Sequence, residues 1–216
     1  MLKILVNNYD KIADYYDSLS RLVFAKSQVN AQINQLSHIP ENSLILIVGG
    51  GTGWILEEIS KIYTSGLKII YVEVSAKMIA LSKHRKTGKN QIEFISTGIE
   101  DFKTAELFDV ILTPFLFDNF IEVRAEIVFR KLNLLLNTNG LWFLVDFSLD
   151  DKKGKWWKWV LLKSMYIFFK IIGIVEANDL VDMKPYFLAE KYQILEEKFY
   201  YGSFIKASIL KKNENR

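Results

Sequence analysis

One stretch, residues 44–59, limits what this chain can fold into more than any other. Five apolar residues at 44–48 precede a glycine-rich turn at 49–53, and apolar residues return with helical spacing from Ile55 to Ile59. The apolar run predicts a buried parallel strand, and the glycines predict a tight turn into a helix. Because glycine has no Cβ, such a turn lets a ligand reach bare backbone N–H groups at the positive end of a helix. We expect a polar ligand here; a glycine turn without a ligand is the alternative.

The glycine spacing narrows the choice of ligand. A dinucleotide-binding fingerprint has a small residue three positions after its second glycine, where helix and strand pack closely. Here the glycines stand at 49, 51 and 53, and that position holds Trp54. Glu73 lies near the end of the next apolar run, twenty positions after Gly53. Such folds place an acid at this distance to accept hydrogen bonds from both ribose hydroxyls, although a solvated loop carboxylate fits the pattern too.

Composition limits the class of protein. The chain has 216 residues, 50% of them hydrophobic, with a net charge of +3, which suits one α/β domain and argues against disorder or strong attraction to nucleic acid. The absence of cysteine excludes disulfides and thiolate catalysis. The apolar run at residues 1–6 is too short for a signal peptide, so we expect a cytoplasmic protein. Only two histidines are present, His38 and His84, so we expect any general base among carboxylates and tyrosines.

Two motifs carry a resemblance to a known family. The turn at 49–53 resembles the first motif of the class I, Rossmann-like S-adenosylmethionine (SAM)-dependent methyltransferases, and Glu73, Ser75 and Met78 are similar to that family's VDxSxxM pattern, with glutamate for aspartate. The resemblance implies SAM as methyl donor and S-adenosylhomocysteine (SAH) as product. The donor-site residues that it implies are Gly49, Gly50, Gly51, Thr52, Gly53, Glu73, Val74, Ser75, Met78, Gly98, Ile99, Glu100, Thr113, Pro114, Phe115 and Tyr15.

The N-terminal pattern YDxxAxYYD, at residues 9–17, adds to this resemblance. It is similar to the helical cover of the small-molecule and quinone-type subgroup, in which tyrosines close over the methyl donor. Tyr9, Tyr15 and Tyr16 are then implied as pocket residues. A pair of amphipathic helices with tyrosines at the edge of the sheet is the alternative.

Two positions depart from the family pattern. The family commonly has an aspartate for the adenine amino group where this chain has Gly98, and an acid for the amino acid end of the donor where it has Ile47. Ile99 still offers a backbone N–H and an apolar wall, and Glu100 or Asp101 could replace the missing acceptor; helix capping by these acids fits equally well. Loss of both family acids would weaken donor binding or leave a domain that keeps the fold without catalysis.

Polar residues after the fourth expected strand are the candidates for the methyl acceptor. Residues 113–119 should emerge at the carboxyl edge of the sheet, where the ligand crevice of an open parallel sheet lies. Asp118 and Asn119 stand there, and Asp146 ends the fifth strand at the same crevice. We expect Asp118 or Tyr16 to orient or deprotonate the acceptor, with Asn119 and Asp146 binding it. Asp118 as N-cap of the next helix is the alternative.

The remaining apolar runs predict the fold. Further strands are expected at 67–75, in the segment 91–102, from 108 and at 141–147, with a turn at 137–140 before the fifth strand. Runs at 193–201 and 203–210, joined around Gly202, predict an antiparallel hairpin. We expect one methyltransferase domain over 1–216: a three-layer α/β sandwich with a seven-stranded, mostly parallel sheet ending in that hairpin and helices on both faces. A helical cover (1–40) and a helical lid (150–190) complete it.

The segment 155–175 has two interpretations. Its aromatic and aliphatic residues are interrupted by Lys158, Lys163 and Lys170, which makes a membrane span unlikely because a charge at mid-bilayer costs roughly 2.5–3.5 kcal/mol. It could form a lid that lines the pocket for an apolar substrate, or lie in a membrane surface. The lid is preferred, and its expected substrate-binding residues are Trp156, Met165 and Phe169.

The function expected from these features is methyl transfer from SAM to a small, apolar or aromatic acceptor by in-line displacement. A non-catalytic SAM-binding or membrane-surface module with the same fold is the main alternative. An NAD oxidoreductase is disfavoured by Trp54 and the hairpin, and aminopropyl transfer is a weaker alternative. We expect no metal site and no nucleic-acid partner, with peripheral membrane contact through 155–175 as the one macromolecular contact indicated.

Overall fold

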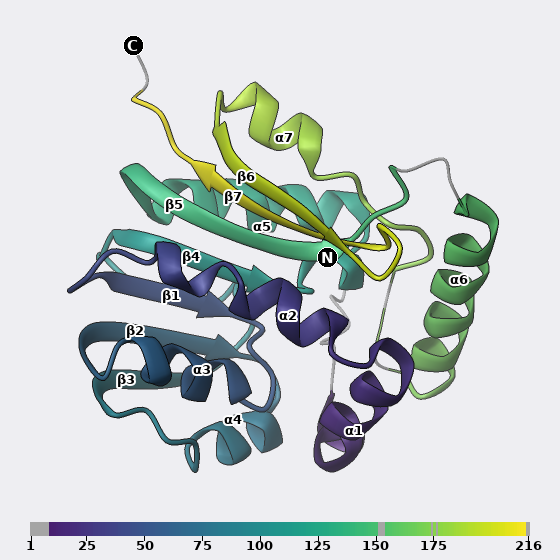
Figure 1. Ribbon diagram of the computed structural model, residues 1–216, viewed down its shortest axis with the longest axis horizontal. Coiled ribbons are helices and arrows are strands. Elements are labelled where there is room, and N and C mark those ends of the chain that lie inside the picture. The colour runs from purple at the N-terminus through teal and green to yellow at the C-terminus, as the bar shows by residue number, and fades with distance from the viewer. Residues whose placement is uncertain (1–8, 151–153, 174, 176, 215–216) are drawn as a thin grey trace.

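The computed structural model describes residues 9–150, 154–173, 175 and 177–214. Within them, seven strands form one sheet in the order β3-β2-β1-β4-β5-β7-β6. Strands β1 to β5 are parallel, and β7 pairs antiparallel with both β5 and β6 (Figure 1). The predicted fold class is thereby confirmed. The N-terminal run at 1–6 lies outside the described residues.

The strands are β1 (Leu44–Val48), β2 (Ser65–Glu73), β3 (Lys89–Ser96), β4 (Phe108–Pro114), β5 (Leu136–Phe147), β6 (Gln193–Tyr200) and β7 (Ile205–Lys211). The α-helices are α1 (Ala13–Phe24), α2 (Ser27–Ile33), α3 (Trp54–Ile62), α4 (Ala76–Ser82), α5 (Glu122–Leu135), α6 (Lys155–Ile171) and α7 (Lys184–Ala189). Short 3₁₀ turns are η1 (Tyr9–Lys11), η2 (Leu36–His38) and η3 (Phe117–Asn119).

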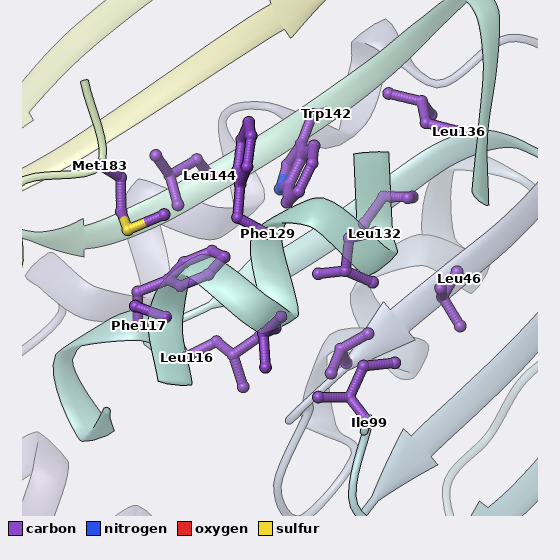
Figure 2. Close-up of a cluster of buried hydrophobic side chains, with 14 of the residues drawn as sticks. Leu46, Ile99, Leu116, Phe117, Phe129, Leu132, Leu136, Trp142, Leu144 and Met183 are labelled. Atoms are coloured by element: carbon purple, nitrogen blue, oxygen red, sulfur yellow. The ribbon is translucent and has the colours of Figure 1, made fainter. Parts of the chain in front are cut away.

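Side chains alternate between two cores, one on each face of the sheet. In β1, Ile45 and Ile47 pack on the α3 side, whereas Leu46 and Val48 pack on the α5 side. This is the period-two alternation of a strand that is buried on both faces. On the α5 side, Phe129 stacks on Trp142 of β5, with ring centroids 5.4 Å apart and planes inclined by 16° (Figure 2). The sheet is therefore packed against side chains on both faces.

Helix α5 differs in detail from the prediction. Its N-cap is Ile121, and Asp118 lies earlier, in η3, so the alternative that Asp118 caps this helix is wrong. The helix also leads directly into β5 at Leu136, whereas a turn was predicted at 137–140. The register jumps there, since Phe108 pairs with Leu136 and Val110 with Leu141. The polar residues 137–140 thus form an irregular bulge within the strand rather than a turn before it.

Helices α1 and α6 stand beyond the carboxyl edge of the parallel strands (Figure 1). They share a third core with the ends of β5 and β7, in which Leu162 and Tyr166 of α6 and Phe24 of α1 are buried. Helix α7 instead packs on the α5 side, where its Phe187 meets Trp142 edge-on at 5.0 Å. The two predicted N-terminal helices are α1 and α2, and α1 with η1 lies where the ligand crevice opens.

Candidate active site at the carboxyl edge of the sheet

A pocket opens at the carboxyl edge of the sheet, with an empty volume of about 1000 Å³ when the adjoining open solvent is included. Its floor comes from the ends of β1 to β4 and its cover from η1, α1 and α2. Ligand sites of open parallel sheets lie at this edge. Of the predicted residues, the lining includes Tyr9, Tyr16, Gly49, Gly50, Gly51, Thr52, Glu73, Val74, Met78, Gly98, Ile99, Glu100, Pro114, Phe115 and Asn119.

The glycine turn is held open by its backbone and by a tyrosine beneath it. Gly51 and Gly53 have φ of 62° and 79°, in the left-handed region that favours glycine. At Gly50, a Cβ would lie 2.5 Å from the hydroxyl oxygen of Tyr71, so no side chain fits. That hydroxyl donates to the carbonyl oxygen of Gly51 at 2.9 Å. The turn therefore presents backbone to the pocket, and Gly53 itself serves as N-cap of α3 behind the lining.

Glu73 ends β2 with its carboxylate turned toward this turn. One oxygen accepts the N–H of Gly51 at 3.1 Å and the other the N–H of Ser75 at 2.9 Å. Burial raises the pKa of the carboxyl, and these two N–H bonds oppose the rise. Ser75 caps α4 by accepting the N–H of Met78 and donates its hydroxyl proton to Asp10, so it acts beside the pocket and not in its lining.

Glu100 occupies the space that Gly98 leaves. Its Oε2 lies 3.2 Å from the position that a Cβ at residue 98 would take. Its other oxygen accepts from Nε of Arg124, whose guanidinium also lies 4.3 Å from the ring centroid of Phe120. Asp101 is exposed, and residues 98–102 form a turn in which Phe102 N–H bonds back to Gly98, so the alternative of helix capping by these acids is wrong.

Two tyrosines of the N-terminal segment meet over the pocket. The rings of Tyr9 and Tyr16 pack edge to face, with centroids 5.7 Å apart, and the Tyr9 hydroxyl donates to Oδ1 of Asn119. Burial raises the pKa of both phenols, so both stay protonated near neutral pH and act as hydrogen-bond donors rather than bases. Tyr15 points away, with 73% of its surface exposed.

Thr52 ties the glycine turn to the cover. Its hydroxyl lies 2.8 and 2.9 Å from the two carboxylate oxygens of Asp17 on α1. Arg85 donates to the Thr52 carbonyl at 2.9 Å and to Asp17 at 3.3 Å. Asp17 lines the pocket beside the turn. The last acid of YDxxAxYYD thus fixes the cover to the glycine motif.

The end of β4 is strained where it meets the pocket. Phe115 has φ of 50°, a left-handed value that a non-glycine side chain rarely adopts, and its ring packs on Phe147 at 5.1 Å. Pro114 lines the pocket beside it. Thr113 does not, because it is fully buried and accepts the indole N–H of Trp142 at 2.9 Å.

Asp118, which is half-buried, and Asp146, which is buried, form an acidic pair behind the pocket wall. The backbone N–H of Asp118 donates to Asp146 Oδ2 at 3.3 Å, and Asn119 Nδ2 donates to Asp118 Oδ1 at 2.9 Å. Burial, with Asp146 close by, raises the pKa of Asp118 well above its usual range. Burial also raises the pKa of Asp146 to about 7. Asp118 reaches the lining only through Asn119, whereas Asp146 faces a second cavity, beside α7.

Helix α6 contributes no residue to the lining of the pocket. Trp156 is 75% exposed, and Met165 and Phe169 pack in the third core. Phe169 touches the cover from outside, with its ring centroid 6.3 Å from that of Tyr9. The structure therefore does not bring the three residues predicted from the lid to the substrate.

Sequence reasoning missed several lining residues. Asp17 was part of a quoted motif, but its bond to Thr52 joins segments 35 residues apart. Arg124 lies on α5 and pairs with Glu100 across 24 residues. No local sequence pattern predicts these contacts. The one indication was Glu100, an acid two positions after Gly98, where the family has an aspartate. The other missed residues are Ser20, Gln28, Val29, Gln32, Val48, Trp54, Val72, Thr97, Leu116 and Phe120.

Comparison with known proteins agrees with this geometry. Residues 45–140 match a family model described as a methyltransferase domain. This stretch is similar to a methyltransferase domain, and the sheet around it has the class I, Rossmann-like methyltransferase fold. The matched stretch of this methyltransferase domain runs from β1 into β5 and contains the glycine turn, Glu73 and Glu100. No curated protein sequence matches the chain.

Solved structures share the fold of this methyltransferase domain at low identity. A Burkholderia thailandensis 1,6-didemethyltoxoflavin-N1-methyltransferase, with its substrate and SAH bound, is 11% identical at a TM-score of 0.65, over 95% of this chain and 86% of that one. The N-methyltransferase NodS of Bradyrhizobium japonicum with SAH is 16% identical at 0.59, over 87% of each chain. Human N-acetylserotonin methyltransferase with SAM is 16% identical at a TM-score of 0.63, over 94% of this chain and 56% of that one.

Proposed function

We propose that this methyltransferase domain transfers a methyl group from SAM to a small, apolar or aromatic acceptor. The observation that carries the proposal is the single pocket edge at which the bare glycine turn, the Glu73 carboxylate and the Gly98–Glu100 turn converge. The acceptors named for two structural neighbours, 1,6-didemethyltoxoflavin and N-acetylserotonin, are small molecules, which supports this class.

The donor site needs a ribose acceptor and an adenine acceptor. Glu73 accepts one N–H on each oxygen, and each carboxylate oxygen has a further lone pair for a ribose hydroxyl. Glu100 has its Oε2 where the family's aspartate would project from position 98, while Arg124 holds its other oxygen. We assign the adenine amino group to Glu100, which replaces the acid that Gly98 lacks.

The amino acid end of the donor must be held without an acid at position 47. Ile47 is fully buried in the core on the α3 side, so no carboxylate can act from there. Besides Glu73, the carboxylate that lines the pocket next to the glycine turn is that of Asp17. We assign to Asp17 the contact with the donor ammonium group, which would keep the donor site without an acid at position 47.

The methyl group of SAM is already activated by its sulfonium, so the chain's own residues have to align the acceptor and take its proton. Tyr9 and Tyr16 are protonated donors that can orient an acceptor oxygen or nitrogen. The acidic pair behind the pocket wall, Asp118 with Asp146, would take this proton through an intervening water, and the pKa of Asp146, which burial raises to about 7, suits a base near neutral pH. Asn119 lies between this pair and the pocket and bonds to Asp118 and Tyr9.

The test is SAH formation with a panel of phenols, quinones and lipids. We expect turnover with at least one acceptor, and a loss of about 10²–10⁴-fold in kcat in Asp118→Asn, the range of a general base. Asp101→Asn, which changes an exposed acid, is the control and should keep full turnover. Unchanged turnover in Asp118→Asn would remove the base assignment. SAM binding without turnover across the panel would favour the non-catalytic alternative.

A further inference from the structure

Helix α6 exposes an apolar stripe to the outside of the molecule. Trp156, Ile167 and Ile171 have exposed fractions of 75%, 60% and 79%. With Val160, these residues are spaced to fall on one face of a 3.6-residue helix. The flanking Trp159 and Phe168 are exposed by 52% and 45%. Large apolar side chains in one contiguous exposed stripe indicate an interaction surface.

The opposite face of α6 is already in use. Leu162 and Tyr166 are buried against the third core, and the Tyr166 hydroxyl donates to the backbone carbonyl of Asp118 at 3.1 Å. The outward stripe is therefore not the side of α6 that packs on the core. It is a second apolar side of the same helix.

The charged residues of α6 indicate what kind of surface binds the stripe. Helix α6 contains four lysines and no acid. Lys163 and Lys170 follow one flank of the stripe at helical spacing, and Lys163 Nζ lies 5.9 Å from a Trp159 ring centroid. Lys163 and Lys170 also contact Asp179 and Asn178 on the next segment. A lysine beside an apolar stripe can keep its ammonium at a polar boundary while its methylenes enter an apolar phase.

We propose that α6 docks this protein on an anionic phospholipid surface, with the Trp156–Ile171 stripe inserted in the interfacial plane and the lysine flank on the headgroups. Interfacial helices combine Trp and Phe on one face with lysines beside them, whereas the cores of protein–protein interfaces are depleted in lysine. In the described part of the chain, none of the helices is long and apolar enough to cross a bilayer. The helix therefore lies on the surface.

This docking places the pocket cover beside the lipid. Phe169 of α6 meets Tyr9 of the cover, and Lys11 Nζ donates to the Ile172 carbonyl at 3.1 Å. An acceptor dissolved in the membrane would then reach the pocket from the α6 side. This consequence for the acceptor rests on the proposed function, whereas the docking itself does not.

The test uses co-sedimentation with vesicles of phosphatidylcholine, with and without phosphatidylglycerol. The wild-type chain should pellet with the anionic vesicles, less with pure phosphatidylcholine, and less again at high salt. The double variant Ile167→Glu/Ile171→Glu should partition at least about tenfold more weakly, because two exposed isoleucines lose their insertion. Leu134→Glu, which changes a 75% exposed leucine on α5, is the matched control and should pellet like wild type.

Each other outcome overturns the docking. Wild type that stays in the supernatant, or equal losses in the double variant and Leu134→Glu, would show that the stripe does not bind lipid. A concentration-dependent dimer that the double variant abolishes, without vesicle binding, would assign the stripe to a second copy of the chain. SAM titration of the double variant in solution separates the two proposals, since donor binding should persist when docking is lost.

Discussion

Tyr71 sets the shape of the glycine turn from outside the glycine motif. It is fully buried on β2, and its hydroxyl bonds to the Gly51 carbonyl while its ring fills the space next to Gly50. We expect Tyr71→Phe to lower the unfolding free energy by about 1–2 kcal/mol, because a buried carbonyl loses its donor, and to weaken SAM binding several-fold. Urea denaturation and calorimetric titration measure the two effects.

Tyr63→Phe is the matched control for this prediction. Its hydroxyl donates to the Ile39 carbonyl at 2.6 Å, and Tyr63 is absent from the pocket lining. The control should lose comparable stability and keep its affinity for SAM. Equal affinity for SAM in the two variants would show that the Tyr71 hydroxyl contributes to stability but not to donor binding.

The acidic pair makes stability depend on pH in a defined direction. The pKa of Asp146 rises from an ordinary 3.8 to about 7, and that of Asp118 rises too, because burial disfavours the charged form of both carboxyls. Between these values the folded protein binds more protons than the unfolded chain, so the unfolding free energy falls as pH rises. This contribution is complete below about pH 4 and lost by the time pH passes 7. Urea denaturation from pH 4.5 to 8 measures the slope.

Asp146→Asn isolates this titration. The variant cannot ionise at residue 146, so its unfolding free energy should fall less than that of wild type, by roughly 1–3 kcal/mol over the same range. A slope identical to wild type would show that Asp146 titrates as an ordinary surface acid does.

At the scale of the element, helix α1 is held down as a cover by acids along its length. Asp17 binds Thr52 and Arg85 with side chains about a quarter exposed, whereas Asp14 pairs with Lys77 where both are about half exposed. We expect Asp17→Ala to loosen α1, shown by faster hydrogen exchange of its amides, and to weaken SAM binding about tenfold. Asp14→Ala removes a solvent-screened surface pair and should change neither the exchange of α1 nor SAM binding. Similar hydrogen-exchange rates of the α1 amides in the two variants would show that Asp17 does not hold α1 over the pocket.

The elements also show what local sequence does and does not determine. The apolar runs predicted the strands of the sheet, most directly the inner ones such as β1 and β4, because burial on both faces demands continuous apolar residues. They did not predict the buried face of α5, where Val123 and Ile127 are exposed by 64% and 53% and Arg124 is buried instead. Nor did they reveal that α6 turns Trp156 and Trp159 outward. Both helices are apolar on more than one side, so the neighbouring elements decide which side is buried.

At the scale of the whole molecule, motif spacing predicted where the pocket lies, since the glycine turn, Glu73 and residues 98–100 all end at one edge. The partners that complete the pocket came from tertiary contacts alone. Tyr71, Asp17 and Arg124 reach their partners across 20 to 35 residues of chain, and Glu100 rather than Asp101 lines the pocket, beside the space left by Gly98. Spacing along the chain fixes which strand ends meet, but not which side chains meet there.

The measurement that tests the account most directly is calorimetric titration of the chain and of Glu73→Ala with SAM, SAH and NAD. We predict micromolar binding of SAM and SAH in preference to NAD, and a loss of about 10–100-fold in Glu73→Ala, the effect expected for hydrogen bonds to a buried charge. Glu58→Ala, which alters an ion pair with Lys61 on α3, should bind like wild type. A thermal melt of Glu73→Ala shows that the variant is folded. No binding of SAM to the wild-type chain, or tighter binding of NAD, would contradict the account.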